Sequence, residues 1–138
     1  MPKYRVIDHT ADLAVYFYGR DPKELFANAA LALAGLMAER PPRSGGETLR
    51  VELEGADIED LFVQWLGELV YHFQARRRLA TRVAILELTP TRLTAEATLA
   101  GFDLERHGLR HEIKAATYHQ VEVKPHGQGW RARAVLDL

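Results

Sequence analysis

Two segments of the 138-residue chain carry their apolar residues on one side of an expected helix, so each helix needs a surface to pack against. The first segment is RDPKELFANAALALAGLM, in which Asp21 is suited to cap the helix and Pro22 to begin it. Its apolar residues at helical spacing are Leu25, Phe26, Ala29, Leu33, Leu36 and Met37. We therefore predict an amphipathic helix with one face in a core.

The second segment is ADIEDLFVQWLGELVYHFQARRR, with Asp57 as its cap and Asp60 in its first turn. Its apolar face consists of Ile58, Leu61, Phe62, Trp65, Leu66, Leu69 and Phe73. The helix is expected to end in Arg76, Arg77 and Arg78, since basic residues in a last turn complement the helix dipole. That explanation is sufficient for the three arginines, so they are not assigned to RNA binding.

Most of the remaining chain alternates apolar and polar residues, as strands do. The predicted strands are YRVI with AVYFYG, as two strands or one interrupted strand, then TLRVELEG, RVAILELT, RLTAEATLAG, HEIKAATYHQVEVK and WRARAVLDL. From residue 82 onward only strands are expected, with FDLERHG as a loop, and AERPPRSGGE is expected to be a mobile loop. The predicted fold class is α+β, a two-layer sandwich with two amphipathic helices on a mixed, largely antiparallel sheet. Residues 1–138 are expected to form a single domain.

Composition narrows the classes of function. Lys and Arg total 18 against 19 for Asp and Glu, so net charge gives no reason to expect nonspecific attraction to nucleic acid or to a membrane surface. The absence of cysteine excludes disulfides, thiolate metal sites and thiol catalysis. No apolar run has the length of a membrane-spanning helix, and the expected location is the cytoplasm.

Polar residues interrupt the first strand region, where IDHTADL contains Asp8, His9, Thr10 and Asp12. One interpretation is a turn in which these short side chains bond nearby backbone groups. The other is an oxygen-rich site for a metal ion or a phosphate. Spacing alone leaves both interpretations open.

Further carboxylates lie at the end of the sequence, where Asp137 precedes Leu138 and its α-carboxylate. Chain ends are commonly frayed and solvated, which is one interpretation. If the last strand lies beside the strand that carries Asp12, the carboxylates converge, and a hard cation such as Ca²⁺ would relieve their repulsion. Lys114, within EIKAATYH, is either an edge-strand lysine that discourages aggregation or a cation held near these carboxylates or offered to a partner's phosphate.

Motifs for other chemistry are missing from the sequence. His107 and His111 are four residues apart, but they fall in a loop and strand region, so zinc binding is not expected. The sequence contains no phosphate loop, GxGxxG or GxSxG motif, and no evident pairing of a nucleophile with a base. A stand-alone metal-dependent phosphoester hydrolase using the same carboxylates is therefore disfavoured.

Several of these segments together resemble the archease family. They are IDHTADLAVYFYGRDPKELFANAALALAGLM, EDLFVQWLGELVYHF, EIKAATYH and the terminal VLDL. The resemblance runs in order from Asp8 to Leu138, with Ala14 at a position where a glycine is common and with variation after Tyr118.

This resemblance implies a non-catalytic accessory protein of the RtcB-type RNA ligase, which promotes guanylylation and multiple turnover of that ligase in tRNA splicing or RNA repair. It further implies metal ligands at Asp12, Asp137 and Leu138, the last through its terminal main-chain oxygens, with Ca²⁺ or another divalent cation as the ion. Lys114 matches a residue implicated in activation of the ligase. Asp8 and His9 are expected to support the ligands.

The expected partner is the ligase, with tRNA or other RNA reached mainly through it and with no membrane involved. A chaperone-like modulator of a tRNA-modifying enzyme, such as a tRNA methyltransferase, is the alternative function that the resemblance offers.

Overall fold

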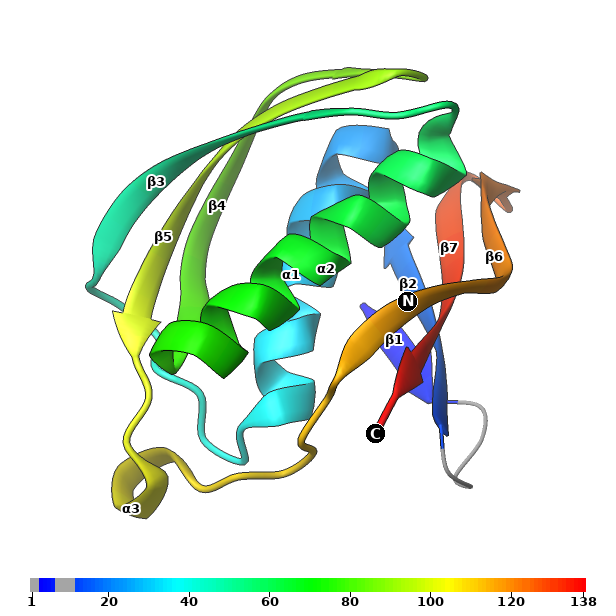
Figure 1. Cartoon of the computed structure of the whole chain (residues 1–138). Helices are drawn as coiled ribbons and strands as arrows, with labels where there is room; N and C mark the ends of the chain where they lie inside the picture. Colours follow the sequence, from blue (N-terminus) through cyan, green and yellow to red (C-terminus); the bar gives the residue numbers. More distant parts are fainter. Residues whose placement is uncertain (1–2, 7–11) are drawn as a thin grey trace.

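Two sheets enclose two long helices in the computed structural model, which describes residues 3–6 and 12–138 (Figure 1). The strands are β1 (Tyr4–Val6), β2 (Asp12–Gly19), β3 (Glu47–Glu54), β4 (Arg78–Thr89), β5 (Arg92–Gly101), β6 (Ala115–His126) and β7 (Gly129–Asp137). The helices are α1 (Pro22–Met37), α2 (Ile58–Arg76) and the short α3 (Leu104–His107). None of the helices in the described residues is long and apolar enough to cross a membrane.

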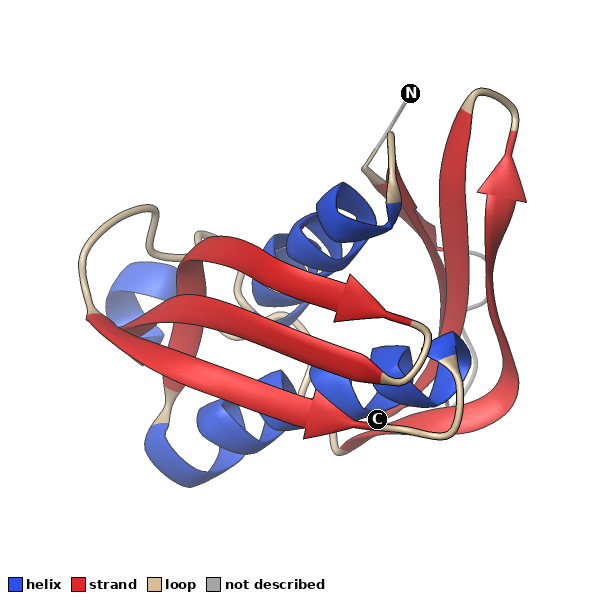
Figure 2. Cartoon of the chain, turned by 90° about the horizontal axis from the view of Figure 1, so that it is seen from above, coloured by secondary structure: helices blue, strands red, loops and turns tan. Residues whose placement is uncertain are grey.

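The strands form a four-stranded sheet in the order β1-β2-β7-β6 and a three-stranded sheet in the order β3-β5-β4 (Figure 2). Every strand pairing among the described residues is antiparallel. The prediction of an α+β fold with largely antiparallel strands is confirmed. The strands are divided between two sheets, and α1 packs against strands of both, β2 and β4.

Alanines in α1 explain why a helix can be covered from both sides. Ala30, Ala32 and Ala34 are buried together with the expected stripe of larger apolar residues, so burial extends well beyond one face of the helix. Small side chains at these positions let a second layer approach the helix closely. The core between the layers includes Trp65, whose indole N–H donates to the carbonyl oxygen of Phe26 at 2.9 Å and links α2 to α1.

Both predicted helix starts are confirmed. The Asp21 carboxylate accepts a hydrogen bond from the N–H of Glu24 at 2.8 Å, and the Asp57 carboxylate accepts one from the N–H of Asp60 at 2.8 Å. These bonds satisfy amide groups that have no partner within the first turn of a helix. Pro22 begins α1, where the missing N–H of proline costs nothing.

The end of α2 differs from the prediction. Arg76 is in the last turn, whereas Arg77 has a left-handed conformation with φ of 50° and ends the helix, and Arg78 begins β4. The guanidinium of Arg77 contacts Glu112 at 3.0 Å and that of Arg78 contacts Glu47 at 3.2 Å. Arg77 and Arg78 therefore form ion pairs that link Glu112 and Glu47 to the end of α2, and only Arg76 lies in the last helical turn.

The region after α2 also differs in detail. Its first strand begins at Arg78 and not at residue 82, and the expected loop FDLERHG contains α3. Asp103 caps this short helix by accepting a hydrogen bond from the N–H of Glu105 at 3.3 Å. Lys114 lies one residue before β6 and not within a strand. At the N-terminal end, β1 and β2 pair as two separate strands, which was one of the two predicted possibilities.

An irregular stretch of β6 is fastened to the start of α2. The Tyr118 hydroxyl donates a hydrogen bond to Oδ1 of Asp60 at 2.6 Å, at a point where the pairing of β6 with β7 shifts between Thr117 and Glu122. This bond lowers the pKa of the Asp60 carboxyl and raises the pKa of the Tyr118 phenol, because it favours the ionised carboxylate and the protonated hydroxyl. The contact connects the four-stranded sheet to α2.

Candidate functional site

Asp12 and Asp137 lie directly opposite each other on neighbouring strands. β2 pairs with β7, and the register places Asp12 against Asp137 and Leu13 against Leu136. Side chains directly opposite in an antiparallel pair lie on the same face of the sheet, with Cβ atoms about 5 Å apart. The structure thus provides the strand pairing on which convergence of the two carboxylates depends.

Alternation along the strands decides which way the two aspartates face. Leu13 and Leu136 are buried in the core, so their neighbours Asp12 and Asp137 are on the outer face of the four-stranded sheet. Asp12 is exposed and Asp137 is partly exposed. Both carboxylates are therefore accessible to solvent or to a partner molecule.

Lys114 reaches the same end of the sheet from the other side of β7. Ala115, the first residue of β6, pairs with Asp137, and the main-chain N–H of Lys114 donates to the main-chain oxygen of Asp137 at 2.8 Å. The Lys114 residue is exposed. Asp12, Asp137 and Lys114 thus lie across three adjacent segments at one end of the sheet.

A glutamine with no distinguishing signal in the sequence holds the segment ahead of β6. The side-chain amide of Gln74, in α2, donates to the carbonyl oxygens of both Ile113 and Lys114, each at 3.0 Å. Ile113 is fully buried and provides a second attachment. The backbone of Lys114 is therefore held on one side by α2 and on the other by Asp137.

Of the three remaining predicted site residues, the structure describes only Leu138. Leu138 is partly buried and packs against the core, directly after Asp137. Asp8 and His9 lie outside the described residues. Within residues 3–6 and 12–138, no three side chains of His, Cys, Asp or Glu are grouped as metal ligands. A cation at Asp12 and Asp137 would need further donors, for which the main-chain oxygens of Leu138 are adjacent.

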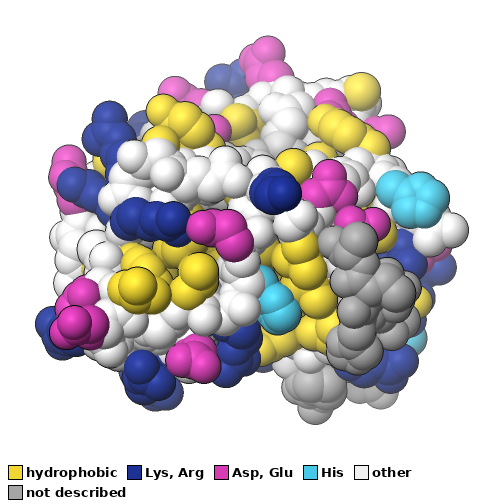
Figure 3. Space-filling view, turned by 60° about the horizontal axis from the view of Figure 1, so that its bottom comes forward, with side chains coloured by type: hydrophobic (Ala, Val, Ile, Leu, Met, Phe, Trp, Pro, Cys, Tyr) yellow, Lys and Arg dark blue, Asp and Glu magenta, His cyan; other side chains and the backbone are white. Residues whose placement is uncertain are grey.

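Charges elsewhere on this side of the molecule are mixed. Figure 3 brings the bottom of Figure 1 forward and shows Lys and Arg side chains dispersed among Asp and Glu side chains and apolar residues. This distribution agrees with the formal net charge of −1. Among the described residues, the paired aspartates are a local feature of the strand end and not part of a broad acidic surface.

The fold and this strand end define an α+β protein in which two antiparallel sheets enclose two helices and present an outward-facing pair of carboxylates. The model of the Archease protein family matches residues 4–138, and the chain belongs to this family. The resemblance found in the sequence is thereby confirmed.

Similar proteins cover nearly the whole chain. The archease of Methanosarcina barkeri is 33% identical over 140 residues, covering 99% of this chain and 96% of that protein. The archease of Archaeoglobus fulgidus is 35% identical over 136 residues, covering 99% of both.

Two solved structures share the fold. The solution structure of protein 1598 from Methanobacterium thermoautotrophicum has a TM-score of 0.79 and 32% identity, with full coverage of both chains. The crystal structure of an archease from Thermotoga maritima, described as a "possible chaperone", has a TM-score of 0.56 at 22% identity, covering 96% of this chain and 94% of that one. The second likeness supports the fold alone.

Proposed function

We propose that this protein is a non-catalytic activator of an RtcB-type RNA ligase, which promotes guanylylation and multiple turnover of the ligase in tRNA splicing or RNA repair. Membership of the archease family supports an accessory role. The observation that carries the specific proposal is the register of β2 and β7, which sets Asp12 against Asp137 on an outward face. We call Asp12, Asp137 and the main-chain oxygens of Leu138 the acidic tip.

The chemistry of the acidic tip suits a hard divalent cation. Like charges directly opposite on neighbouring strands destabilise a sheet, and a cation between the carboxylates would remove that penalty. All donors of the tip are oxygens, the ligand type that Ca²⁺ prefers. Asp12, Asp137 and Leu138 would hold the ion, which would supply positive charge at an exposed end of the sheet. Asp8 and His9 remain predicted supporting residues.

Lys114 would act beside this tip. Its backbone is held by Asp137 and Gln74 while the residue itself is exposed, so its ammonium group can reach a partner without disturbing the sheet. We expect it to offset the carboxylate charge or to contact a phosphate in the active-site cleft of the ligase. Binding of the tip in that cleft would favour the conformation that accepts the guanylate.

The direct test is multiple-turnover RNA ligation by the cognate ligase with GTP and its metal, with and without substoichiometric amounts of this protein. We expect stimulation by the wild-type protein and its loss with Asp137→Asn, which removes one charge and keeps the side-chain shape. Glu96→Gln is the matched control, because Glu96 is an exposed carboxylate on the three-stranded sheet. Full stimulation by natively folded Asp137→Asn would refute the role of the tip.

The ion and its third ligand have separate tests. Calorimetric titration with Ca²⁺ should detect binding by the wild-type protein that Asp12→Asn weakens at least tenfold. A peptide extension after Leu138 should weaken both Ca²⁺ binding and ligase stimulation, whereas the same extension before Met1 should leave both unchanged. Equal behaviour of the two extended proteins would argue against Leu138 as a ligand.

A second function is chaperone-like modulation of a tRNA-modifying enzyme such as a tRNA methyltransferase. The Archease family, to which this chain belongs, includes the Thermotoga maritima protein described as a "possible chaperone", and this shared family favours the second function. It would be supported if the wild-type protein left an active ligase unstimulated, yet suppressed aggregation of the methyltransferase to the same extent with or without Asp137→Asn.

A further inference from the structure

Basic residues gather on the outer face of the four-stranded sheet, away from the acidic tip. Arg5 comes from β1, Lys124 from β6, and Arg131 and Arg133 from β7. Their strand neighbours Val123 and Ala132 are buried in the core, so the alternation along each strand directs these charged side chains outward. We call the four residues, together with Tyr16 of β2, the basic strip.

The strand register brings the members of the basic strip together. Tyr16 lies opposite Arg5 on one side and opposite Arg133 on the other, and Arg131 lies opposite Lys124. The guanidinium carbon of Arg131 is 4.2 Å from the centre of the Tyr16 ring, and that of Arg5 is 5.9 Å from it. Two guanidinium groups therefore flank one aromatic ring at the surface.

Positive charge exceeds negative charge in the strip. Its four cations are accompanied by the carboxylate of Glu122, which lies opposite Arg133 and 3.6 Å from the ammonium of Lys124, so that four minus one leaves a charge of +3 among these described residues. Arg131 and Lys124 are directly opposed cations that repel each other, and the single carboxylate of Glu122 offsets only part of this positive charge, so the strip favours a bound anion. The chain as a whole has a net charge of −1.

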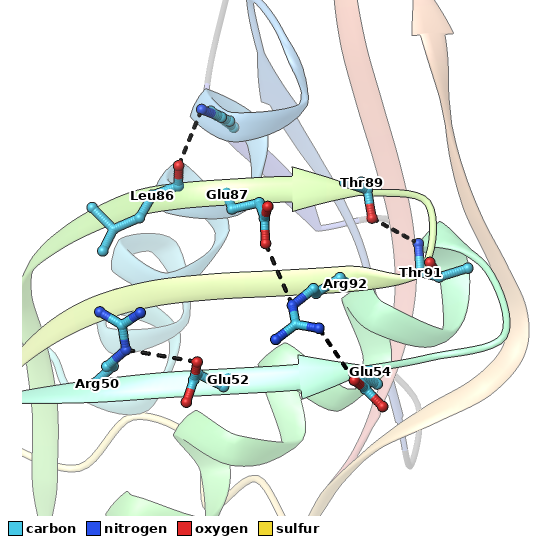
Figure 4. A network of polar contacts seen from close by, with 9 residues as sticks. Arg50, Glu52, Glu54, Leu86, Glu87, Thr89, Thr91 and Arg92 are labelled. Atoms are coloured by element: carbon cyan, nitrogen blue, oxygen red, sulfur yellow. Dashed lines mark hydrogen bonds and ion pairs between the residues drawn. The ribbon is translucent and has the colours of Figure 1, made fainter.

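The outer face of the other sheet shows a different arrangement. There Arg50 pairs with Glu52 at 3.7 Å, and Arg92 pairs with both Glu54 and Glu87 at 3.4 Å (Figure 4). Arg50 and Arg92 on that face are thus matched by carboxylates on the same or neighbouring strands. The basic strip is thus a particular property of the four-stranded sheet, not a general property of the protein's outward-facing strands.

We propose that the basic strip binds single-stranded RNA directly. Guanidinium and ammonium groups neutralise phosphates, while the planes of Tyr16 and its flanking arginines provide surfaces on which unpaired bases stack. Arg131 and Arg133 are two residues apart on one strand, about 7 Å, so they can contact successive groups of an extended backbone. An acidic peptide could neutralise the positive charge of the strip, but it has no bases to stack on the Tyr16 ring.

This inference goes beyond the proposed function, in which RNA is reached through the ligase, and it does not depend on that function. The test is fluorescence anisotropy of a labelled oligouridylate of about twelve nucleotides, with no ligase present. We expect the variant Arg131→Gln/Arg133→Gln to bind at least tenfold more weakly than the wild type. The dependence of log affinity on log salt should also become shallower by about 1.4, since each lost phosphate contact on a single strand contributes about 0.7.

The matched control is Arg50→Gln/Arg92→Gln, which removes the same charge from the other sheet and should bind RNA as the wild type does. Circular dichroism and thermal unfolding confirm the fold of each variant. Failure of the wild type to bind the oligonucleotide, or equal weakening by the two double variants, would overturn the proposal.

The stacking part of the proposal has its own test. Tyr16→Leu should weaken RNA binding several-fold and leave binding of polyglutamate unchanged, and Tyr16→Phe, which keeps the ring, should restore RNA binding. If polyglutamate bound as tightly as RNA and Tyr16→Leu affected neither, the strip would be a general anion-binding surface and the assignment to RNA would be wrong. Ligase stimulation, measured separately, reports on the acidic tip and not on this strip.

Discussion

Replacing Gln74 with methionine would remove both hydrogen bonds that fasten the segment ahead of β6 to α2, while keeping a side chain of similar length. One amide group donates to the carbonyl oxygens of Ile113 and Lys114, each at 3.0 Å. A hydrogen bond of this kind contributes about 0.5–1.5 kcal/mol net, so the pair contributes about 1–3 kcal/mol. Water can replace the amide at the exposed Lys114 more readily than at the buried Ile113, so we expect a loss near 1.5 kcal/mol.

The assay combines urea unfolding with hydrogen exchange at one amide. The N–H of Lys114 donates to the main-chain oxygen of Asp137, and its exchange reports local opening of this segment. A local loss of about 1.4 kcal/mol corresponds to roughly tenfold faster exchange. We therefore expect Gln74→Met to lower the free energy of unfolding and to accelerate exchange of the Lys114 amide by about that factor.

Gln64→Met is the matched control. Gln64 lies near the other end of α2 and donates to one carbonyl oxygen, that of Glu54, at 3.0 Å. Because Glu54 is exposed, the expected loss is about 0.5 kcal/mol, with no change in exchange at Lys114. Equal losses of stability from the two variants, with unchanged exchange at Lys114 in both, would show that Gln74 does not anchor the segment.

Three further predictions concern stability and titration. Gly67→Ala should raise the free energy of unfolding by about 0.5–1 kcal/mol in urea titrations, since Gly67 is inside α2 and an added Cβ meets no atom within 4 Å. Gly19→Ala should instead lower it, because a Cβ there would overlap the main chain of Leu25; a neutral result would contradict that packing. Tyr118→Phe should raise the pKa of Asp60, followed by carbon NMR, because the ionised carboxylate loses the bond that lowers this pKa. That bond stabilises the fold above the unfolded-state pKa of the carboxyl and is lost as pH falls through the folded-state pKa, so the variant should lose less stability on acidification.

Local chemistry made the helices predictable. Asp21 and Asp57 cap their helices as expected, because the cap, the first turn and the apolar stripe are all encoded within a few residues. The division of the strands between two sheets was not predictable in this way. Alanines such as Ala32 give no clear apolar or polar signal, so the pattern does not show that α1 is covered from both sides.

The candidate site depends on contacts between residues that are far apart in the sequence, so the sequence predicts only part of it. Asp12 and Asp137 stand out in the sequence as carboxylates, but their convergence depends on a strand pairing that alternation cannot select, since every strand alternates alike. Gln74 had no distinguishing signal, because a side-chain amide on a helix suggests no particular acceptor. Arg131 and Arg133 did have one, as they alternate with alanines in the last strand, but the cations opposite them come from other strands.

The position of β7 between β2 and β6 affects how the protein is made. Its residues 129–137 leave the ribosome after the other described strands, and until then the inner edges of β2 and β6 lack β7 as their partner. Synthesis proceeds at about 5–20 residues per second, so a nascent chain exposes these edges and part of the apolar surface of α1 for seconds. The four-stranded sheet, and with it the pairing of Asp12 with Asp137, can form only after residue 137 has left the ribosome, so a nascent chain in which β7 has not yet emerged would lack the acidic tip.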